Sequence, residues 1–227
     1  MSDAPHFPFS AVIFDMDGVL VDSEYFYAME ILDLSREFGM GLTREDVFSQ
    51  AGASHQQFRR NLVTWFGRAG RAYTEDEAEA AYGAWAEGRR IDFASVLNPG
   101  VPETVAELRA RGVRVALASS SPLENIERAL AECGLAGAFE VIVSGEQFRE
   151  SKPDPEIYLH TVGLLGLPAR ECCCVEDSIP GITAGKAAGL TVIAKREERF
   201  GFSQEAADAI IDDIPALLAE VFSVRSD

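Results

Sequence analysis

The residues most able to do chemistry in this sequence are carboxylates, hydroxyls and one lysine, and they occur at four separate places. Each place follows a short apolar run with the length and composition of a buried β-strand. In sequence order, the polar residues at these places are Asp15 with Asp17, Ser119, Lys152, and Glu176 with Asp177. If the strands are parallel neighbours, their carboxyl ends lie at one edge of the sheet, where open α/β sheets bind ligands. The sequence therefore predicts one site assembled from all four places.

Several carboxylates at one sheet edge would repel one another. Two carboxylates about 4 Å apart repel by roughly 4 kcal/mol at an effective dielectric constant near 20. Gathering Asp15, Asp17 and Asp177 without compensation would raise their pKa values or oppose folding. A hard divalent cation resolves this conflict, and Mg²⁺ is the usual choice. The lysine, the hydroxyls and the backbone N–H groups of Met16 and Gly18 then remain to bind the anionic oxygens of a phosphoryl group.

The elements that position these residues alternate between strand and helix. Apolar runs predict strands at residues 11–14, 113–118, 141–143, 172–175, 190–194 and 210–211. Helical spacing and helix-end signals predict helices at residues 102–112, 122–133, 155–165, 182–188 and 214–222. Gly181, Gly185 and Gly189 would let the helix that carries them approach the sheet closely. Strands that alternate with helices imply right-handed crossovers, so we expect an α/β fold with a doubly wound, Rossmann-like parallel sheet.

One segment interrupts this alternation, from about residue 24 to residue 94. Apolar residues recur there at helical spacing, for example Tyr25, Met29 and Leu32. Thr74 and Glu77 form a capping-box pattern that starts a further helix. The segment has no convincing strand pattern, so we expect a separate helical unit.

The composition limits which partners the protein is expected to bind and in which cellular compartment it is expected to occur. The 227 residues include 20 Lys and Arg against 37 Asp and Glu, a formal charge of −17, which disfavours nucleic acid and anionic membranes as partners. No secretion signal is recognisable at the N-terminus, and no apolar run approaches the roughly 20 residues of a membrane helix. Three consecutive cysteines, residues 172–174, fit a buried strand better than a disulfide or a zinc site. We therefore expect a reduced, cytoplasmic, monomeric protein.

The four polar places resemble, in order, the four sequence motifs of the haloacid dehalogenase (HAD) superfamily of hydrolases. They read FDMDGVLVDSE at residues 14–24, ASSSP at 118–122, SKPDP at 151–155 and VEDS at 175–178. The details resemble subfamily I, in the branch that contains β-phosphoglucomutase and sugar-phosphate phosphatases. The resemblance implies a discontinuous α/β core domain, residues 1–23 and 95–227, with an α-helical cap domain inserted at residues 24–94.

The resemblance also implies roles for the site residues. Asp15 would be the nucleophile that forms an aspartyl-phosphate, and Asp17 the general acid and then the general base. Ser119 and Lys152 would bind phosphoryl oxygens, and Lys152 would keep Asp15 ionised. The implied magnesium ligands are Asp15, the backbone carbonyl of Asp17, Asp177, and Glu176 as a direct ligand or an outer partner.

The leading hypothesis is a Mg²⁺-dependent phosphatase for a small phosphorylated metabolite, a sugar or polyol phosphate. The alternative is β-phosphoglucomutase, which normally has a basic residue where this chain has Pro122. The mutase's helix histidine and its cap arginine correspond here to Tyr27 and His55. His55 itself is either a substrate contact or a structural histidine. A metabolite sensor without catalytic activity is a more remote alternative, and a dehalogenase is the least favoured.

Overall fold

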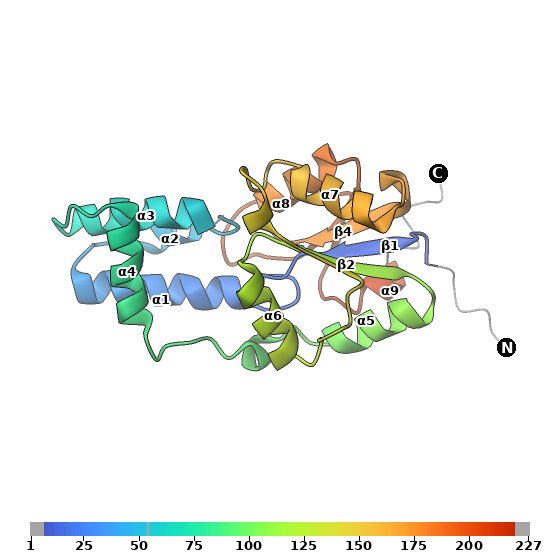
Figure 1. Cartoon of the computed structure of the whole chain (residues 1–227), viewed down its shortest axis with the longest axis horizontal. Helices are drawn as coiled ribbons and strands as arrows, with labels where there is room; N and C mark the ends of the chain where they lie inside the picture. Colours follow the sequence, from blue (N-terminus) through green and yellow to red (C-terminus); the bar gives the residue numbers. More distant parts are fainter. Residues whose placement is uncertain (1–6, 54, 221–227) are drawn as a thin grey trace.

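The fold is built on one six-stranded sheet. The computed structural model describes residues 7–53 and 55–220 of the chain. The strands are β1 (Ala11–Phe14), β2 (Arg114–Ser119), β3 (Val141–Ser144), β4 (Cys172–Glu176), β5 (Thr191–Lys195) and β6 (Ala209–Ile211). All neighbours pair in parallel, in the order β3-β2-β1-β4-β5-β6 (Figure 1). The predicted doubly wound sheet is confirmed, and β1 lies between β2 and β4.

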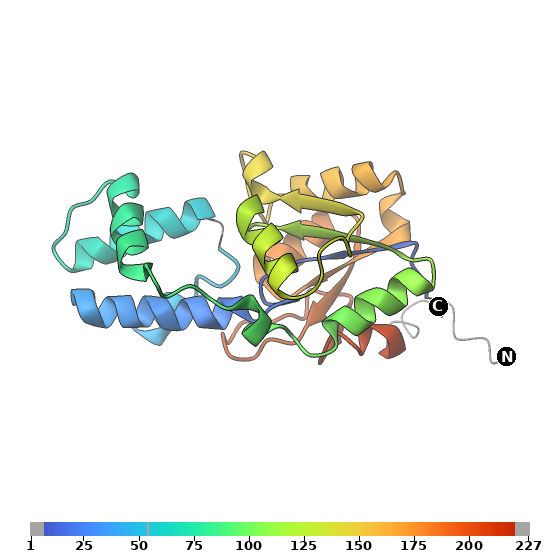
Figure 2. The same ribbon diagram turned by 60° about the horizontal axis from the view of Figure 1, so that its bottom comes forward.

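Helices cover both faces of the sheet (Figures 1 and 2). One face carries α5 (Val101–Ala110), α6 (Leu123–Glu132) and α9 (Leu217–Glu220), and the other carries α7 (Glu156–Leu165) and α8 (Ile179–Ala187). Successive strand side chains point to opposite faces. Accordingly, Val12 and Phe14 pack with the first group of helices, and Ala11 and Ile13 with the second.

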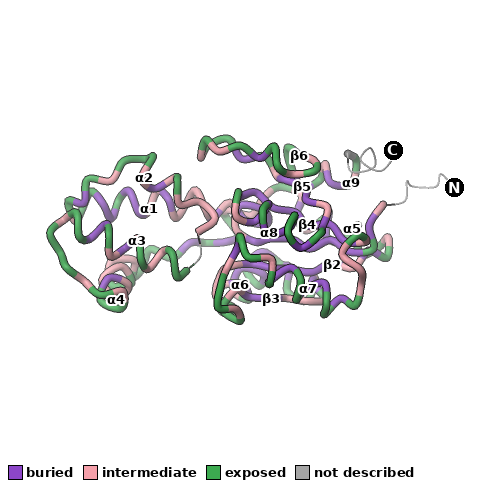
Figure 3. Tube along the Cα trace, turned by 90° about the horizontal axis from the view of Figure 1, so that it is seen from above, coloured by how far each residue is buried: buried purple, intermediate pink, exposed green. Residues whose placement is uncertain are grey.

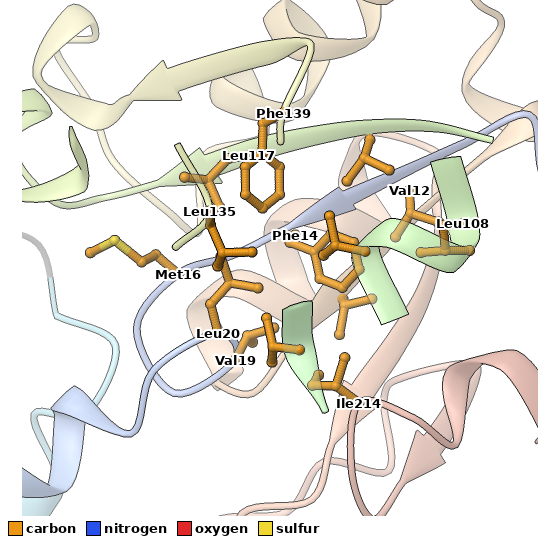
Figure 4. Packing of buried hydrophobic residues seen from close by; sticks show 14 of the residues in the cluster. Val12, Phe14, Met16, Val19, Leu20, Leu108, Leu117, Leu135, Phe139 and Ile214 are labelled. Carbon is orange, nitrogen blue, oxygen red and sulfur yellow. The ribbon is translucent and has the colours of Figure 1, made fainter. Parts of the chain in front are cut away.

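The strands beside the site are buried on both faces. Phe14 is fully buried at the centre of one hydrophobic cluster, where its ring meets Phe139 edge-on at 6.3 Å (Figure 4). Burial continues along the neighbouring strands, as the purple sections of Figure 3 show. The three cysteines of β4 are fully buried free thiols, which confirms that they serve as small apolar strand residues.

A helical unit lies beside the sheet and consists of α1 (Ser23–Phe38), α2 (Arg44–Phe48), α3 (His55–Arg68) and α4 (Glu75–Ala86). It has its own hydrophobic cluster, in which Leu62 and Phe66 are fully buried. The predicted capping box at the start of α4 is present, with Thr74 and Glu77 exchanging hydrogen bonds. The described residues between 24 and 94 contain no strand, as expected.

The two chain connections between the sheet and the helical unit run side by side (Figure 2). The N–H of Asp22 donates to the carbonyl of Val96 at 2.7 Å, and Val21 and Leu97 form an isolated antiparallel bridge. Asn98 also donates from its side chain to the carbonyl of Val19 at 2.8 Å. We call residues 21–22 and 96–97 the hinge.

Two predicted helices have different bounds in the structure. The helix predicted to begin at residue 182 begins at Ile179, because the Ser178 hydroxyl accepts a hydrogen bond from the N–H of Gly181 and caps it. The last helix runs only from Leu217 to Glu220, and residues 221–227, into which its prediction extends, lie outside the described residues. None of the described helices is long and apolar enough to cross a membrane.

The glycine spacing of α8 generates a stability prediction. A Cβ at Gly185 would lie 2.6 Å from Cys174 Sγ and 2.8 Å from a methyl group of Val192. Gly185→Ala should therefore destabilise the protein by about 1–3 kcal/mol through overpacking. The control is Gly83→Ala in α4, where a Cβ meets nothing within 4 Å; it should be neutral or stabilise by up to about 1 kcal/mol. Urea unfolding measures both, and equal effects would contradict the close packing.

Candidate active site

The carboxyl ends of β1 and β4 bring three carboxylates together. Asp15 directly follows β1, Glu176 ends β4, and Asp177 comes next in the chain. All three residues are buried, and each offers a carboxylate oxygen within 4.8 Å of the others. Lys152, from the segment that precedes α7, reaches the same place. The structure therefore joins sequence positions that lie up to 162 residues apart.

The ammonium group of Lys152 sits at the centre of this cluster and is buried. Its Nζ lies 2.7 Å from Glu176 Oε1, 3.0 Å from the carbonyl of Ala118 and 3.0 Å from Asp15 Oδ1. Burial alone would lower the pKa of Lys152, but the charges of Asp15 and Glu176 and the hydrogen bonds to them raise it above its usual value. The lysine is therefore a permanent cation among the carboxylates.

Asp15 has a buried carboxyl group, one oxygen of which lacks a hydrogen bond. Burial raises its pKa to about 7, the nearby charges of Glu176 and Asp17 add to that effect, and Lys152 opposes it. Oδ1 is buried and makes no well-aligned hydrogen bond, although it lies 3.0 Å from the ammonium of Lys152. A buried carboxylate oxygen without a hydrogen bond is costly unless a further positive group satisfies it.

Asp17 lies next to this cluster and is oriented by hydroxyl groups. Ser121 donates to Oδ2 at 2.7 Å, and Ser23 donates to Oδ1. Ser119 is fully buried at the end of β2, where its Oγ lies 3.5 Å from Asp17 Oδ2 and accepts a hydrogen bond from the N–H of Ser121. The carboxyl group of Asp17 is thus fixed in direction beside Asp15, as a proton donor and acceptor must be.

Glu176 is fully buried and its oxygens already accept hydrogen bonds. Oε1 accepts from Lys152 and from the hydroxyl of Tyr158, and Oε2 accepts from the N–H of Asp177 at 3.2 Å and from Ser178 at 3.5 Å. The Tyr158 ring also lies under the ammonium of Lys152, 5.0 Å away. These contacts make Glu176 a group that holds Lys152 in place.

Asp177 approaches the turn after β1 very closely. Burial raises its pKa well above the usual value, and the charges of Glu24 and Glu176 add to this. A Cβ on Gly18, which has a φ of 78°, would lie 1.9 Å from Asp177 Oδ2, so only glycine fits there. The N–H of Gly18 donates to the carbonyl of Val21 at 2.7 Å. This N–H is therefore engaged within the turn, and substrate binding by Gly18 stays a prediction.

The residues present fit a divalent metal ion. The donors are hard oxygens, which suit cations such as Mg²⁺, Mn²⁺ or Ca²⁺ and do not suit soft metals. Asp15 and Asp177 both have pKa values raised by burial and by neighbouring carboxylates, and one Asp15 oxygen lacks a hydrogen bond. A bound cation would lower the pKa values of both carboxyl groups and would also give the Asp15 oxygen a partner. The side chain of Asp17 lies outside the cluster, in agreement with the expectation that only its backbone carbonyl is a ligand.

A cleft of about 540 Å³ opens from Asp15 and Asp17 between the sheet edge and the helical unit. Glu24 lines it from the first turn of α1 and accepts a hydrogen bond from the N–H of Gly52 at 3.1 Å. Burial and the charge of Asp17 raise the pKa of Glu24 to about 8. Further along, the wall is polar and aromatic, formed by Tyr27, Gln50, Asn61, Tyr82, Asn125 and Arg128. The cleft can therefore hold a small polar molecule against Asp15.

His55 and Met16, two further predicted site residues, lie in different surroundings. His55 lines the cleft, but its Nε2 lies 3.0 Å from Glu79 Oε1, so it has a partner within the helical unit. The side chain of Met16 is buried in the hydrophobic cluster around Phe14, which leaves only its backbone for a substrate (Figure 4).

Sequence reasoning missed three polar residues of the site. Tyr158 lies on α7 and contacts Glu176 only through the tertiary fold, so no local signal marks it. The position of Ser121 just before a helix predicts a capping role, yet α6 has no side-chain cap and Ser121 donates a hydrogen bond to Asp17 instead. Ser23 stood within the first motif, and its spacing six residues after Asp17 was the available signal.

A parallel α/β sheet with this carboxylate–lysine cluster at its edge and a helical unit over it has the groups that a phosphoryl-transfer hydrolase requires. Residues 9–189 match the family of haloacid dehalogenase-like hydrolases. The chain belongs to that family, as the motifs predict.

Characterised relatives are similar over most of this chain. It is 33% identical over 187 residues to hexitol phosphatase B of Escherichia coli (strain K12), which covers 81% of this chain and 82% of that protein. It is 32% identical over 187 residues to the chloroplastic protein SUPPRESSOR OF QUENCHING 1 of Arabidopsis thaliana, of which it spans only 18%. A crystal structure of a Thermotoga maritima protein provisionally assigned as β-phosphoglucomutase superposes with a TM-score of 0.73 at 26% identity, covering 95% of this chain and 99% of that one.

The raised pKa of Asp15 generates a prediction about stability and pH. Its carboxyl titrates at about 7 in the folded protein and near 3.9 in an unfolded chain, so the folded state binds more protons between these values. Stability without metal should therefore fall as the pH rises through 7. Asp15→Asn should remove much of this fall and, at about pH 8.5, melt roughly 5 °C or more above the wild type.

Thermal melts of the metal-free protein at several pH values measure this effect. Added Mg²⁺ should stabilise the wild type more at high pH than at low pH, because metal and protons compete for the same oxygens. Identical pH dependence in the wild type and in Asp15→Asn would contradict the assignment.

Proposed function

We propose that this protein is a Mg²⁺-dependent phosphatase that hydrolyses a small sugar or polyol phosphate through an aspartyl-phosphate at Asp15. The observation that carries the proposal is the pairing of Asp15 with the buried Lys152 ammonium at 3.0 Å, beside an Asp17 carboxyl oriented by two serines. A nucleophile, a fixed cation and a directed proton carrier are the parts that in-line phosphoryl transfer requires.

The proposed reaction has two displacements. A carboxylate oxygen of Asp15 attacks phosphorus, the bond from phosphorus to the sugar oxygen breaks, and the Asp17 carboxyl gives its proton to that leaving oxygen. Asp17, now ionised, takes a proton from a water molecule that attacks the phosphorus, which releases inorganic phosphate and restores the Asp15 carboxylate. The two steps together consume one water and leave the protein unchanged.

Lys152 has a specific part in the first step. Its three N–H bonds are directed to Ala118, Glu176 and Asp15, and the Asp15 contact is poorly aligned. As the Asp15 oxygen bonds to phosphorus, its negative charge passes to the leaving oxygen, which Asp17 protonates, and the third N–H of Lys152 can turn to the anionic phosphoryl oxygens now beside it. Ser119 is proposed as a further donor to the phosphoryl group, together with the backbone N–H of Met16.

We propose Mg²⁺ as the metal, with Asp15, Asp177 and the backbone carbonyl of Asp17 as ligands. Glu176 is proposed as an outer partner, because its oxygens already accept four hydrogen bonds. When bound, the ion would neutralise charge on the transferring phosphoryl group. The helices of residues 24–94 are proposed to act as the cap domain over the core of residues 1–23 and 95–227, in a cytoplasmic monomer.

The substrate class follows from the lining of the cleft and from the relatives. Hydroxyl and amide side chains such as Tyr27, Asn61 and Asn125 offer partners for sugar hydroxyls. Two of the cations along the wall are already paired, Arg128 with Glu132 at 3.3 Å and Arg89 with Glu37 at 4.0 Å. This pairing favours a substrate with one phosphate, and the hexitol phosphatase relative acts on molecules that its name places in this class.

A β-phosphoglucomutase is the second candidate, supported by the similarity to the Thermotoga maritima structure. A mutase must bind a sugar that carries phosphate at both ends. The wall of the cleft carries the carboxyl groups of Glu30 and Glu124, which would repel a second phosphate. The phosphatase is therefore the better supported of the two, and a metabolite sensor without activity is the least supported.

A panel of phosphomonoesters incubated with Mg²⁺ tests the proposal. We expect phosphate release from at least one hexose or hexitol monophosphate, and a loss of kcat/KM of at least about a thousandfold in Asp15→Asn. Removal of divalent metal by a chelator should abolish turnover, and added Mg²⁺ should restore it. Full activity in Asp15→Asn, or no turnover of any member, would refute the proposal.

The same assay separates the two enzymes. We expect a sugar monophosphate to be preferred over the corresponding bisphosphate by at least about tenfold in kcat/KM, because Arg128 and Arg89 on the wall are already paired with carboxylates. Conversion of glucose 1-phosphate to glucose 6-phosphate, stimulated by trace glucose 1,6-bisphosphate, would instead identify a mutase.

A further inference from the structure

The connection between β5 and β6, residues 196–208, contacts three parts of the molecule. The proposed reaction requires these parts to keep fixed positions relative to one another. It binds the hinge through Arg199, the helical unit through Phe200, and the end of β4 through Gln204. Nothing in the hydrolytic steps uses these residues, and Arg199 and Gln204 do not line the cleft.

Arg199 holds the first strand of the hinge. Its guanidinium donates to both carboxylate oxygens of Asp22, at 2.8 and 2.6 Å, and to Glu197 at 2.9 Å, while lying 4.8 Å from the centre of the Tyr25 ring. Asp22 occupies the N-cap position of α1 but makes no side-chain capping bond there. Its carboxylate is therefore committed to Arg199 in a two-point contact, which fixes direction as well as distance.

Phe200 extends this contact to the helical unit. Its ring meets Phe48 of α2 edge-on at 5.1 Å, and Phe48 in turn lies 6.3 Å from Tyr25 of α1. Phe200 packs against the hydrophobic cluster of the helical unit and also lines the cleft, alongside Val47 and Gly52. A core residue thus forms part of the wall that the helical unit otherwise supplies.

Gln204 connects the same segment to the metal-binding end of β4. Its side chain is buried, donates to the carbonyls of Asp177 at 2.6 Å and Lys195 at 2.7 Å, and accepts from the N–H of Glu197 at 3.0 Å. Glu197 is also the second partner of Arg199. A continuous set of hydrogen bonds therefore runs from the backbone of Asp177 to the hinge at Asp22.

We propose that residues 196–204 form a positioning strap, in which Arg199 and Phe200 set the helical unit over the cleft in register with Asp15 and Asp177. Arg199 and Phe200 are positioning residues: they act through Asp22 and Phe48 and not on the reacting atoms. The strap thereby determines how tightly an extended substrate is bound. This inference rests on the proposed function only for its kinetic readout.

Arg199→Gln and Phe200→Ala test the strap by two measurements. In amide hydrogen exchange of the full-length protein, both variants should exchange several-fold faster in α2 and in the loop around Gly52, with little change in β1 and β4. In kinetics, KM for a hexitol phosphate should rise about tenfold while kcat falls by less than about threefold. The exchange measurement needs no activity, so it stands even if the proposed substrate class is wrong.

Matched controls separate positioning from general loss of stability. Arg196→Gln removes an arginine of the same segment that pairs with Asp212 at 2.6 Å and with Glu198 at 3.9 Å, neither of which belongs to the hinge or the helical unit; it should match the wild type in both measurements. Phe200→Leu keeps an apolar contact with Phe48 and should recover most of the loss in Phe200→Ala. Unchanged exchange in α2 for both test variants, or a fall in kcat of more than about tenfold at an unchanged KM, would overturn the inference.

Discussion

The contact between the Lys152 ammonium and the carboxylates of Asp15 and Glu176 is the interaction on which the rest of the site depends. Three buried carboxylates at the end of a parallel sheet would otherwise oppose folding, because each charge has lost its water. One buried cation offsets only part of that charge, and burial together with the neighbouring carboxylates leaves Asp15 and Asp177 with raised pKa values. This incomplete compensation is the feature that suits the proposed metal ion, because a fully neutralised cluster would have no need of a further cation.

The fold produces this cluster by placing β1 between β2 and β4. Strands whose side chains are buried on both faces can be short and apolar, and their carboxyl ends then carry the polar residues without disturbing the core. The helical unit has a hydrophobic cluster of its own, so its position over the cleft is set by a few contacts at the hinge and the strap. In the proposed function, chemistry and substrate selection therefore reside in different parts of the chain.

Much of the sheet and of the catalytic cluster could be predicted from sequence, since both depend on local patterns. Continuous apolar runs predicted every strand of the sheet, and the four motifs identified Asp15, Lys152 and Asp177. What could not be predicted depends on tertiary packing. Tyr158 meets Glu176, and Arg199 meets Asp22 across 177 residues, without any signal at either position. The start of α8 was placed too late because Ser178, its cap, was interpreted as part of a site motif.

The most direct measurement is single-turnover labelling with a hexitol phosphate that carries radioactive phosphorus, using the wild type, Asp15→Asn, and Asp17→Asn to slow hydrolysis of the intermediate. We predict acid-stable, hydroxylamine-sensitive label on the peptide that contains Asp15, more of it in Asp17→Asn than in the wild type, and none in Asp15→Asn. Phosphate release without label on that peptide at any time, or label that persists in Asp15→Asn, would contradict covalent catalysis by Asp15.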